Sequence, residues 1–282
     1  MVENRPILNI LAHLVLILGV LVVAFPIYIA FIASTHGPTD FLSGLIPLTP
    51  GHDTWHTYMT MLTTGMQTSG MPPLSLQMMN SLIMALTIAI GKISISIISA
   101  YAIVYFRFPF RNLAFWLIFI TLMLPVEVRI LPTYKVVADL GMLDTYAGLT
   151  IPLIASATAT FLFRQVFLTI PDELMEAARI DGAGPMKFFW DILLPMSRNN
   201  IAALFVILFI YGWNQYLWPL LITTDASHYT IVMGIKRMAD VADSQPQWNY
   251  IMATAILAML PPVLVVIFMQ KLFVKGLIET EK

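Results

Sequence analysis

Long apolar segments separated by shorter polar ones dominate the hydrophobic pattern of this chain. A helix needs about 20 residues to cross the hydrocarbon core of a bilayer. Six ranges are long and apolar enough, namely 7–33, 78–106, 112–131, 146–168, 199–222 and 249–273. They lack the short alternating segments of a transmembrane barrel. The pattern therefore predicts an all-α integral membrane protein in which residues 1–282 form one membrane domain with six transmembrane helices.

Composition supports the membrane prediction and excludes several other classes. Hydrophobic residues make up 59% of the 282 residues and charged residues only 11%, whereas soluble domains average roughly 45–50% and 25%. Disordered chains need low hydrophobicity and nucleic-acid binders need an excess of cations, but the formal net charge here is −1. Because the chain has no Cys, disulfides, thiolate metal sites and a cysteine nucleophile are excluded.

Lys and Arg residues set the expected orientation, because the cytoplasmic loops of membrane proteins carry an excess of them. Of the 15 Lys and Arg residues, ten fall in the terminal segments and in the alternate loops on the same side of the membrane. Lys135, Lys236 and Arg237 fall in the opposite loops, and Lys92 and Arg129 lie within predicted spans. This distribution predicts that both termini are cytoplasmic.

The segment 171–198, which this topology places in the cytoplasm, has the pattern of two short helices. We expect the first over 172–181, where Gly182 then permits a sharp turn. We expect the second over 186–194, stopped by Pro195. On composition alone, the segment is an amphipathic element at the inner membrane surface. The spacing of its small and charged residues favours a more specific interpretation.

That spacing is carried by Glu176-Ala177-Ala178, by Gly182 and by Ile192-x-Leu194-Pro195. It resembles the cytoplasmic loop of permeases in ATP-binding-cassette (ABC) importers. In that family the loop is a coupling helix that docks into a cleft of the ATPase subunit, so the resemblance implies the same role here. The residues implied in ATPase docking are Glu176, Ala177, Ala178, Asp181, Gly182, Ile192, Leu194 and Pro195.

The resemblance extends over nearly the whole chain. The segments that resemble carbohydrate-type permeases, the maltose-permease branch, are 124–125, 132–134, 140–149 and 213–216. Within this branch, 91–93, 106–109 and 124–130 resemble permease subunits of sn-glycerol-3-phosphate importers. The resemblance implies the type I importer permease fold in a bacterial cytoplasmic (inner) membrane. It also implies a heterodimer with a second homologous permease subunit, two ATPase subunits and an extracytoplasmic substrate-binding protein.

No motif for ATP hydrolysis or covalent catalysis accompanies these features. Gly91-Lys92 lacks both the preceding Gly and the following Ser or Thr of a phosphate loop. We therefore expect ATP and Mg²⁺ on the partner ATPase and no cofactor on this chain. No Ser/His/Asp arrangement is present, so no catalytic residue is predicted. His52, Asp53 and His56 have a spacing that also suits a metal site, but we interpret them as a solvated loop and predict no metal ligand.

Three charged residues lie deep in predicted spans. Lys92 is 14 residues from either end of the span 78–106, which is roughly 21 Å by the helical rise and too far for snorkelling. By the same rise, Glu127 and Arg129 lie at a similar depth in the span 112–131. Two interpretations stay open. Either Lys92 and Glu127 neutralise each other as a packing pair, or Lys92 and Arg129 offer positive charge to an anionic substrate.

A second set of candidate pathway residues lies in the span 199–222. Its members follow one another at i, i+3, i+4 and i+7, which is one face of a continuous helix. They are Tyr211, Asn214, Gln215 and Trp218. Amides and aromatic faces suit a polyol or a sugar, and they also serve as ordinary contacts between helices.

The predicted external loop 223–248 is long for a connection between adjacent spans. In carbohydrate-type importers the corresponding loop reaches into the binding protein and helps to dislodge the substrate, so the resemblance implies that role for residues 225–238. The residues implied are Tyr229, Met233, Gly234 and Lys236. The alternative is a helix lying on the outer membrane face, which the apolar run 231–233 suits equally.

Together these features predict a non-catalytic, membrane-spanning permease subunit of an ATP-driven, binding-protein-dependent importer. The resemblance implies sn-glycerol 3-phosphate or glycerophosphodiesters as the substrate, and two membrane-embedded cations suit a phosphate ester. One alternative is the same importer class carrying an uncharged sugar or polyol. Another is a proton-coupled secondary transporter, which would need titratable carboxylates along its path, whereas only Glu127 lies deep in a span.

Overall fold

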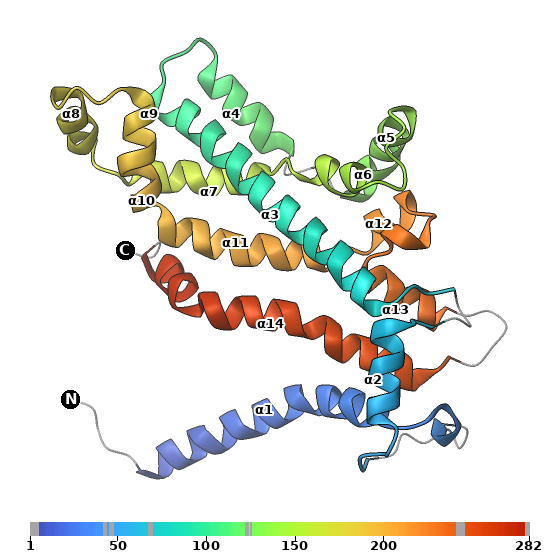
Figure 1. The fold of residues 1–282 in the computed structure, drawn as a ribbon. Coiled ribbons are helices and arrows are strands. Elements are labelled where there is room, and N and C mark those ends of the chain that lie inside the picture. Colours follow the sequence, from blue (N-terminus) through green and yellow to red (C-terminus); the bar gives the residue numbers. More distant parts are fainter. Residues whose placement is uncertain are drawn as a thin grey trace. The chain divides into compact units, whose positions relative to one another are not determined.

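The computed structural model of the protein describes residues 6–41, 44, 48–66, 70–121, 124, 126–240 and 246–279. Regular structure in these ranges is helical throughout, and they contain no strand (Figure 1). The predicted all-α class is therefore confirmed. The helices fall into two compact units, one of residues 1–76 and 234–260 and the other of residues 77–233 and 261–282.

The first unit contains α1 (Pro6–Ser34), the 3-10 turn η1 (Pro38–Phe41) and α2 (Thr54–Thr63). The second unit contains all but the first turn of α3 (Leu74–Tyr105), then α4 (Arg111–Ile120), α5 (Val126–Asp139), α6 (Tyr146–Thr150), η4 (Ile151–Leu153), α7 (Ala157–Leu168), α8 (Asp172–Ile180), α9 (Pro185–Phe188), the π-helical turn η5 (Phe189–Leu193), α10 (Leu194–Met196), α11 (Arg198–Trp213), α12 (Leu217–Ile222) and η6 (Ala226–His228). Like α3, the helices α13 (Ile231–Ala239) and α14 (Trp248–Glu279) have residues in both units.

Three of these helices are long and apolar enough to cross a membrane, over Ile7–Ser34, Leu74–Tyr105 and Trp248–Lys271. They coincide with three of the ranges predicted from hydropathy. Two further candidates are bent pairs of helices, Tyr146–Leu153 with Ala157–Leu168 at 47° and Pro185–Met196 with Arg198–Trp213 at 71°. By length and composition, the described residues thus contain three to five candidate spans.

Three predicted ranges contain an interrupted helix rather than a continuous one. In 112–131, α4 ends at Ile120 and α5 begins at Val126. In 146–168, the side chain of Ser156 accepts a hydrogen bond from the N–H of Ala159 at 3.3 Å and so starts α7 anew. In 199–222, α11 ends at Trp213 before α12 begins. Pro219 in α12 has no N–H with which to continue α-helical bonding, which contributes to this last break.

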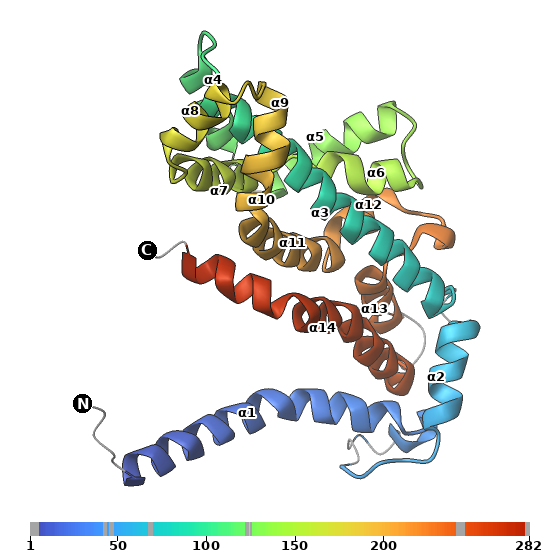
Figure 2. The same ribbon diagram turned by 60° about the vertical axis from the view of Figure 1, so that its left-hand side comes forward.

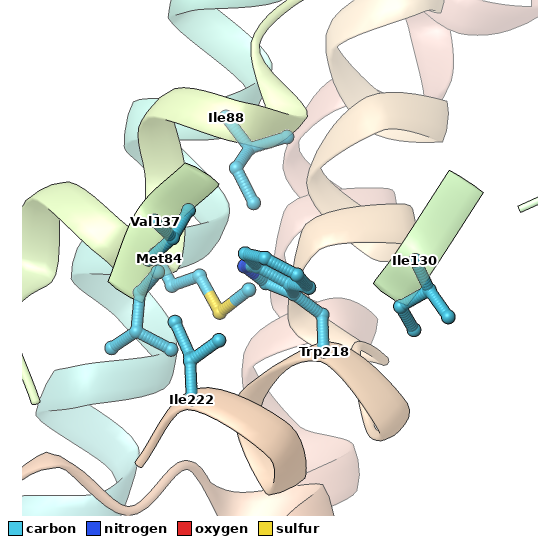
Figure 3. Packing of buried hydrophobic residues seen from close by; sticks show 7 residues of the cluster. Met84, Ile88, Ile130, Val137, Trp218 and Ile222 are labelled. Atoms are coloured by element: carbon cyan, nitrogen blue, oxygen red, sulfur yellow. The ribbon is translucent and has the colours of Figure 1, made fainter. Parts of the chain in front are cut away.

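The buried core of the second unit joins α3, α5, α6 and α12. Its members are Met84, Ile88, Ile130, Val137, Leu149, Trp218 and Ile222. Figure 3 shows the indole of Trp218 in the midst of the labelled side chains. Helix α11 also lies very close to α3, because a Cβ added at Gly212 would come within 2.8 Å of the Ala85 Cα. The broken helices are therefore packed directly on the unbroken α3.

A polar cluster follows α1 in the first unit and centres on His36. Its Nδ1 lies 2.9 Å from the Asp40 carboxylate, and its Nε2 lies 2.8 Å from the Thr49 carbonyl oxygen. Burial lowers the pKa of His36, but the hydrogen bonds to Thr49 and Asp40 outweigh it and raise the pKa above 6.5. The doubly protonated ring can donate to both acceptors at once, so this cluster favours the charged form.

The raised pKa of His36 makes the stability of this cluster depend on pH. The stabilisation is fully present below the unfolded pKa near 6.5 and is lost as the pH rises through the folded pKa. We expect His36→Gln to remove this pH-dependent part, at most about 1 kcal/mol because the Asp40 side is solvent-exposed. Thermal unfolding midpoints of the wild type and of His36→Gln, each measured at pH 5.5 and pH 8.5, check this expectation. Equal pH dependence in the wild type and in His36→Gln would contradict it.

Candidate functional site

The coupling segment, residues 171–198, begins with a short helix that has strong local start and stop signals. Pro171 occupies the N-cap of α8, and the acidic Asp172 and Glu173 lie in its first turn, where the helix dipole favours negative charge. The helix ends at Ile180, and Gly182 then adopts a φ of 75°. This left-handed conformation is one that glycine adopts without steric cost. The predicted helix and turn are both present.

The second half of the coupling segment differs from the prediction. We predicted a helix stopped by Pro195, but the helical backbone runs from Pro185 through a π-helical turn to Met196 and breaks only at Ser197. In a π turn the hydrogen bonds run from residue i to i+5. The hydrogen-bonding register therefore changes directly before Pro195, which cannot donate a backbone hydrogen bond. This change of register accounts for a backbone that stays helical through Pro195.

The predicted docking residues differ in exposure. Ala178 is buried and faces the protein, and Ile192 and Leu194 are half-buried. The exposed members of the set are Glu176, Ala177, Asp181, Gly182 and Pro195. Two residues that the sequence reasoning missed are more prominent: Ile180 is 86% exposed and Met186 64% exposed. The sequence does contain a signal for them, since Ile180 and Met186 are apolar residues on either side of the turn at Gly182.

The coupling segment is attached to the C-terminal end of α3 by aromatic side chains. The Tyr101 hydroxyl donates to the Pro185 carbonyl oxygen at 2.8 Å, and the Tyr101 ring lies 5.0 Å from that of Phe189. The ring of Tyr105 lies 5.3 Å from that of Phe188. Figures 1 and 2 both show α9 beside this end of α3. The sequence reasoning did not identify either tyrosine, because their partners are distant in the chain.

A cavity of about 1110 Å³ lies between α8 and the C-terminal end of α3. Its charged lining consists of Arg107, Arg111, Arg179, Asp172 and Glu176. Because Glu176 and Arg179 both line it, the cavity adjoins the surface predicted to dock the ATPase.

Several predicted pathway residues lie together on α3, α5 and α11. Lys92 is 8% exposed, and its ammonium lies 3.9 Å from the centre of the Tyr211 ring. Arg129 is exposed and lies within electrostatic range of both Lys92 and Tyr211. The Gln215 side-chain amide donates to the Tyr211 carbonyl oxygen at 3.0 Å. The side chain of Glu127 lies outside the described residues, so its pairing with Lys92 stays a prediction.

The remaining two predicted pathway residues do not share a helical face with Tyr211. Asn214 is the exposed C-cap residue of α11, and Trp218 belongs to α12. The continuous face expected over 199–222 is therefore wrong, because α11 ends at Trp213. Trp218 is 4% exposed and donates its indole N–H to the Gly148 carbonyl oxygen at 3.1 Å. It packs in the core of the second unit.

The predicted release loop contains a short 3-10 turn, η6, and the helix α13. Tyr229 is 6% exposed and Met233 is fully buried, so both pack inward. Gly234 lies in the middle of α13. Lys236, in the last turn of this helix, forms an exposed ion pair with Asp240 at 2.9 Å. Contact with a binding protein would therefore fall on other side chains than Tyr229 and Met233.

Within the described residues, regular structure is helical and includes apolar helices long enough to cross a membrane, which agrees with an integral membrane protein. Residues 92–279 match the family described as the binding-protein-dependent transport system inner membrane component. The match covers more than half of the chain, so the protein belongs to this family.

Relatives of known name are similar over their whole length. The sn-glycerol-3-phosphate transport system permease protein UgpE of Agrobacterium fabrum (strain C58) is 63% identical over 282 residues, which is 100% of both chains. The protein of the same name from Brucella melitensis biotype 1 is 61% identical, again over 100% of both chains.

Solved structures show the same fold. A bacterial ABC transporter involved in the import of the acidic polysaccharide alginate matches with a TM-score of 0.80 at 20% identity, covering 96% of this chain and 98% of that one. A bacterial alginate ABC transporter in complex with its alginate pentasaccharide-bound periplasmic protein matches with a TM-score of 0.62 at 15% identity, covering 93% and 92%. At these identities the likeness concerns the fold alone.

Substitutions on the exposed side of α8 and in the turn that follows it test the predicted docking role of the coupling segment. We expect Glu176→Lys and Gly182→Arg each to abolish uptake while leaving membrane insertion intact. The first reverses a charge on the face predicted to dock the ATPase, and the second puts a bulky side chain on a backbone with positive φ. Radiolabelled uptake and co-purification of the ATPase subunit measure the effect.

A matched control is Asp139→Lys, a charge reversal at an exposed carboxylate on α5 whose ion pair with Lys135 is solvent-exposed and weak. It keeps both uptake and ATPase binding. Normal transport with a fully bound ATPase in Glu176→Lys and Gly182→Arg would exclude this face as the docking site.

Proposed function

We propose that this chain is the membrane-spanning permease subunit of an ABC importer that carries sn-glycerol 3-phosphate, or glycerophosphodiesters, into the cell. The observation that supports the substrate most strongly is the 63% identity, over the full length of both chains, to a permease named for sn-glycerol-3-phosphate transport. A buried cation at Lys92 agrees with an anionic substrate. The main competing substrate class is an uncharged sugar or polyol.

We propose six membrane crossings with both termini in the cytoplasm of a bacterium and the protein in its inner membrane. Support comes from the membrane-length α1, α3 and α14 and from the two bent helix pairs. The excess of Lys and Arg in one set of loops supports the orientation. The sixth crossing would run through α4 and α5.

The proposed assembly pairs this chain with a second, homologous permease subunit. Two ATPase subunits on the cytoplasmic side would bind ATP and Mg²⁺ and hydrolyse the nucleotide, while this chain binds no cofactor and performs no covalent chemistry. An extracytoplasmic binding protein would deliver the substrate. The family description and the resemblance to ABC importers support this arrangement.

The proposed mechanism transmits ATPase closure through the coupling segment to α3. The Tyr101–Pro185 hydrogen bond and the ring contacts of Tyr101 and Tyr105 join the two, so a displacement of α8 and α9 displaces the end of α3. Lys92 lies on the same helix and moves with it. A phosphate ester in transit would meet Lys92 and Arg129, since charge-assisted hydrogen bonds to phosphate are strong in a low-dielectric environment.

Substituting Lys92 tests the substrate directly. We expect Lys92→Met to reduce uptake of sn-glycerol 3-phosphate by about tenfold or more, the effect of losing one charge-assisted hydrogen bond. The amount of complex in the membrane should stay unchanged. Uptake of radiolabelled substrate into proteoliposomes that contain the whole importer measures it, and Lys135→Met, at an exposed lysine of α5, is the matched control.

The double variant Lys92→Met with Glu127→Gln separates the two interpretations of Lys92. If the pair serves only packing, removing both charges is nearly neutral and restores uptake. If Lys92 binds the phosphate, the double variant stays as impaired as Lys92→Met. Transport of an uncharged sugar, with no uptake of sn-glycerol 3-phosphate by the wild type, would contradict the proposed substrate.

A further inference from the structure

The segment 223–231, here named the loop root, is where the predicted release loop leaves the second unit. Its Thr223, Tyr229, Thr230 and Ile231 are buried. The sequence segment 140–149, which carries part of the family resemblance, has no role in the function derived so far. The structure brings these two segments together with the first turns of α3.

Asp144 binds the loop root through three hydrogen bonds to its carboxylate. One oxygen accepts from the backbone N–H groups of Thr224 at 2.6 Å and Asp225 at 2.9 Å, and the other accepts from the Thr224 hydroxyl at 2.7 Å. The Asp144 N–H donates in turn to the Ile222 carbonyl oxygen at 3.1 Å. The hydrogen bond from the Asp225 N–H contributes most to lowering the pKa of Asp144, and His228 lowers it further. The charged form is therefore the one that binds.

Asn80 on α3 holds the same segment from its buried side. Its side-chain amide donates to the carbonyl oxygens of Ser227 at 2.8 Å and Tyr229 at 3.0 Å. Its side-chain oxygen accepts from the Tyr146 hydroxyl at 2.6 Å. Next to it, the Ser81 hydroxyl oxygen accepts from the Ile231 N–H at 2.8 Å. Asn80 is completely buried, so each of these bonds offsets a desolvation cost.

We infer that Asn80 and Asp144 are positioning residues that fix the root of the release loop on the end of α3 opposite the coupling segment. The inference rests on the proposed function in that it takes residues 225–238 as the part that meets the binding protein. Asn80 and Tyr101 are 21 residues apart on one helix, or roughly 32 Å by the helical rise. Through α3, the fixed loop root and the coupling segment move together.

Purely structural residues would affect stability, whereas positioning residues affect how the importer responds to its binding protein. In the complete importer, we expect Asp144→Asn combined with Tyr146→Phe to leave basal ATP hydrolysis unchanged. The concentration of loaded binding protein that gives half-maximal stimulation should rise by about tenfold, the effect of losing a charge-assisted hydrogen bond. The matched control is Asp139→Asn on α5, which should keep the wild-type response.

Hydrogen exchange reports the loop root independently of transport. In the same Asp144→Asn, Tyr146→Phe variant, peptides that contain the amides of Thr224, Asp225 and Ile231 should exchange faster than in the wild type. Peptides from α8 should be unchanged. Asn80 itself is too deeply buried for a first test, since its loss leaves two carbonyl groups without partners.

A disulfide provides the rescue that a structural role does not predict. The chain has no Cys, so Asp144→Cys with Thr224→Cys introduces one defined pair at the position of the lost hydrogen bonds. Reduced, this variant should respond more weakly than the wild type, because the hydrogen bonds of Asp144 are lost. Oxidised, it should recover the wild-type response, because the covalent bond fixes the loop root again.

The outcomes separate the inference from the proposed function. Unchanged hydrogen exchange in the double variant, or faster exchange with a wild-type response, would overturn the positioning role. A photoreactive residue at the exposed Lys236 tests the release loop itself. If it fails to cross-link to the binding protein while exchange, response and disulfide rescue follow expectation, the positioning role stands. The assignment of residues 225–238 as the contact is then the part that is wrong.

Discussion

Polar side chains of the unbroken α3 donate hydrogen bonds to backbone carbonyl groups where segments of the second unit begin or break. The carbonyl groups of Pro185 and Ser156 accept these bonds in addition to bonds from within their own helices. Its Tyr101 binds the carbonyl oxygen of Pro185 at the start of α9. Ser96 donates to the carbonyl oxygen of Ser156 at 3.2 Å, where α7 starts anew. Asn80 binds two carbonyl oxygens of the loop root. Three segments of the second unit, the starts of α7 and α9 and the loop root, are thus held by polar side chains along one continuous helix.

This arrangement explains why buried polar residues gather on α3. In lipid, an unsatisfied polar group costs several kcal/mol, which is more than the roughly 1 kcal/mol of a typical destabilising mutation. Asn80 and Ser96 are fully buried, so their hydrogen bonds to neighbouring segments offset that cost and fix each segment at one place along α3. The Asn80 contact lies near the start of α3, and the Ser96 and Tyr101 contacts lie in its C-terminal third, so segments far apart in the sequence are connected through one helix.

The sequence predicted the parts of the fold that depend on local pattern. The long helices α1, α3 and α14 follow from hydropathy, and α8 follows from Pro171, its acidic first turn and Gly182. The breaks at Ser156 and after Trp213 were not predicted, because apolar residues continue on both sides and hydropathy does not record hydrogen bonding. The side chain that donates to the Ser156 carbonyl group, Ser96, comes from a distant part of the chain and has no local signal.

The candidate pathway shows the same division between local and tertiary information. Depth along a helix identified Lys92 as a buried charge, but only the packing of α11 on α3 places the Tyr211 ring against its ammonium. A cation–π contact contributes about 0.5–2 kcal/mol, whereas a charge-assisted bond to phosphate is stronger in a low-dielectric environment. Under the proposed function, an arriving phosphate would displace Tyr211 from Lys92. Tyr211 would contact the Lys92 ammonium again once the substrate leaves, so this ammonium would have a partner throughout.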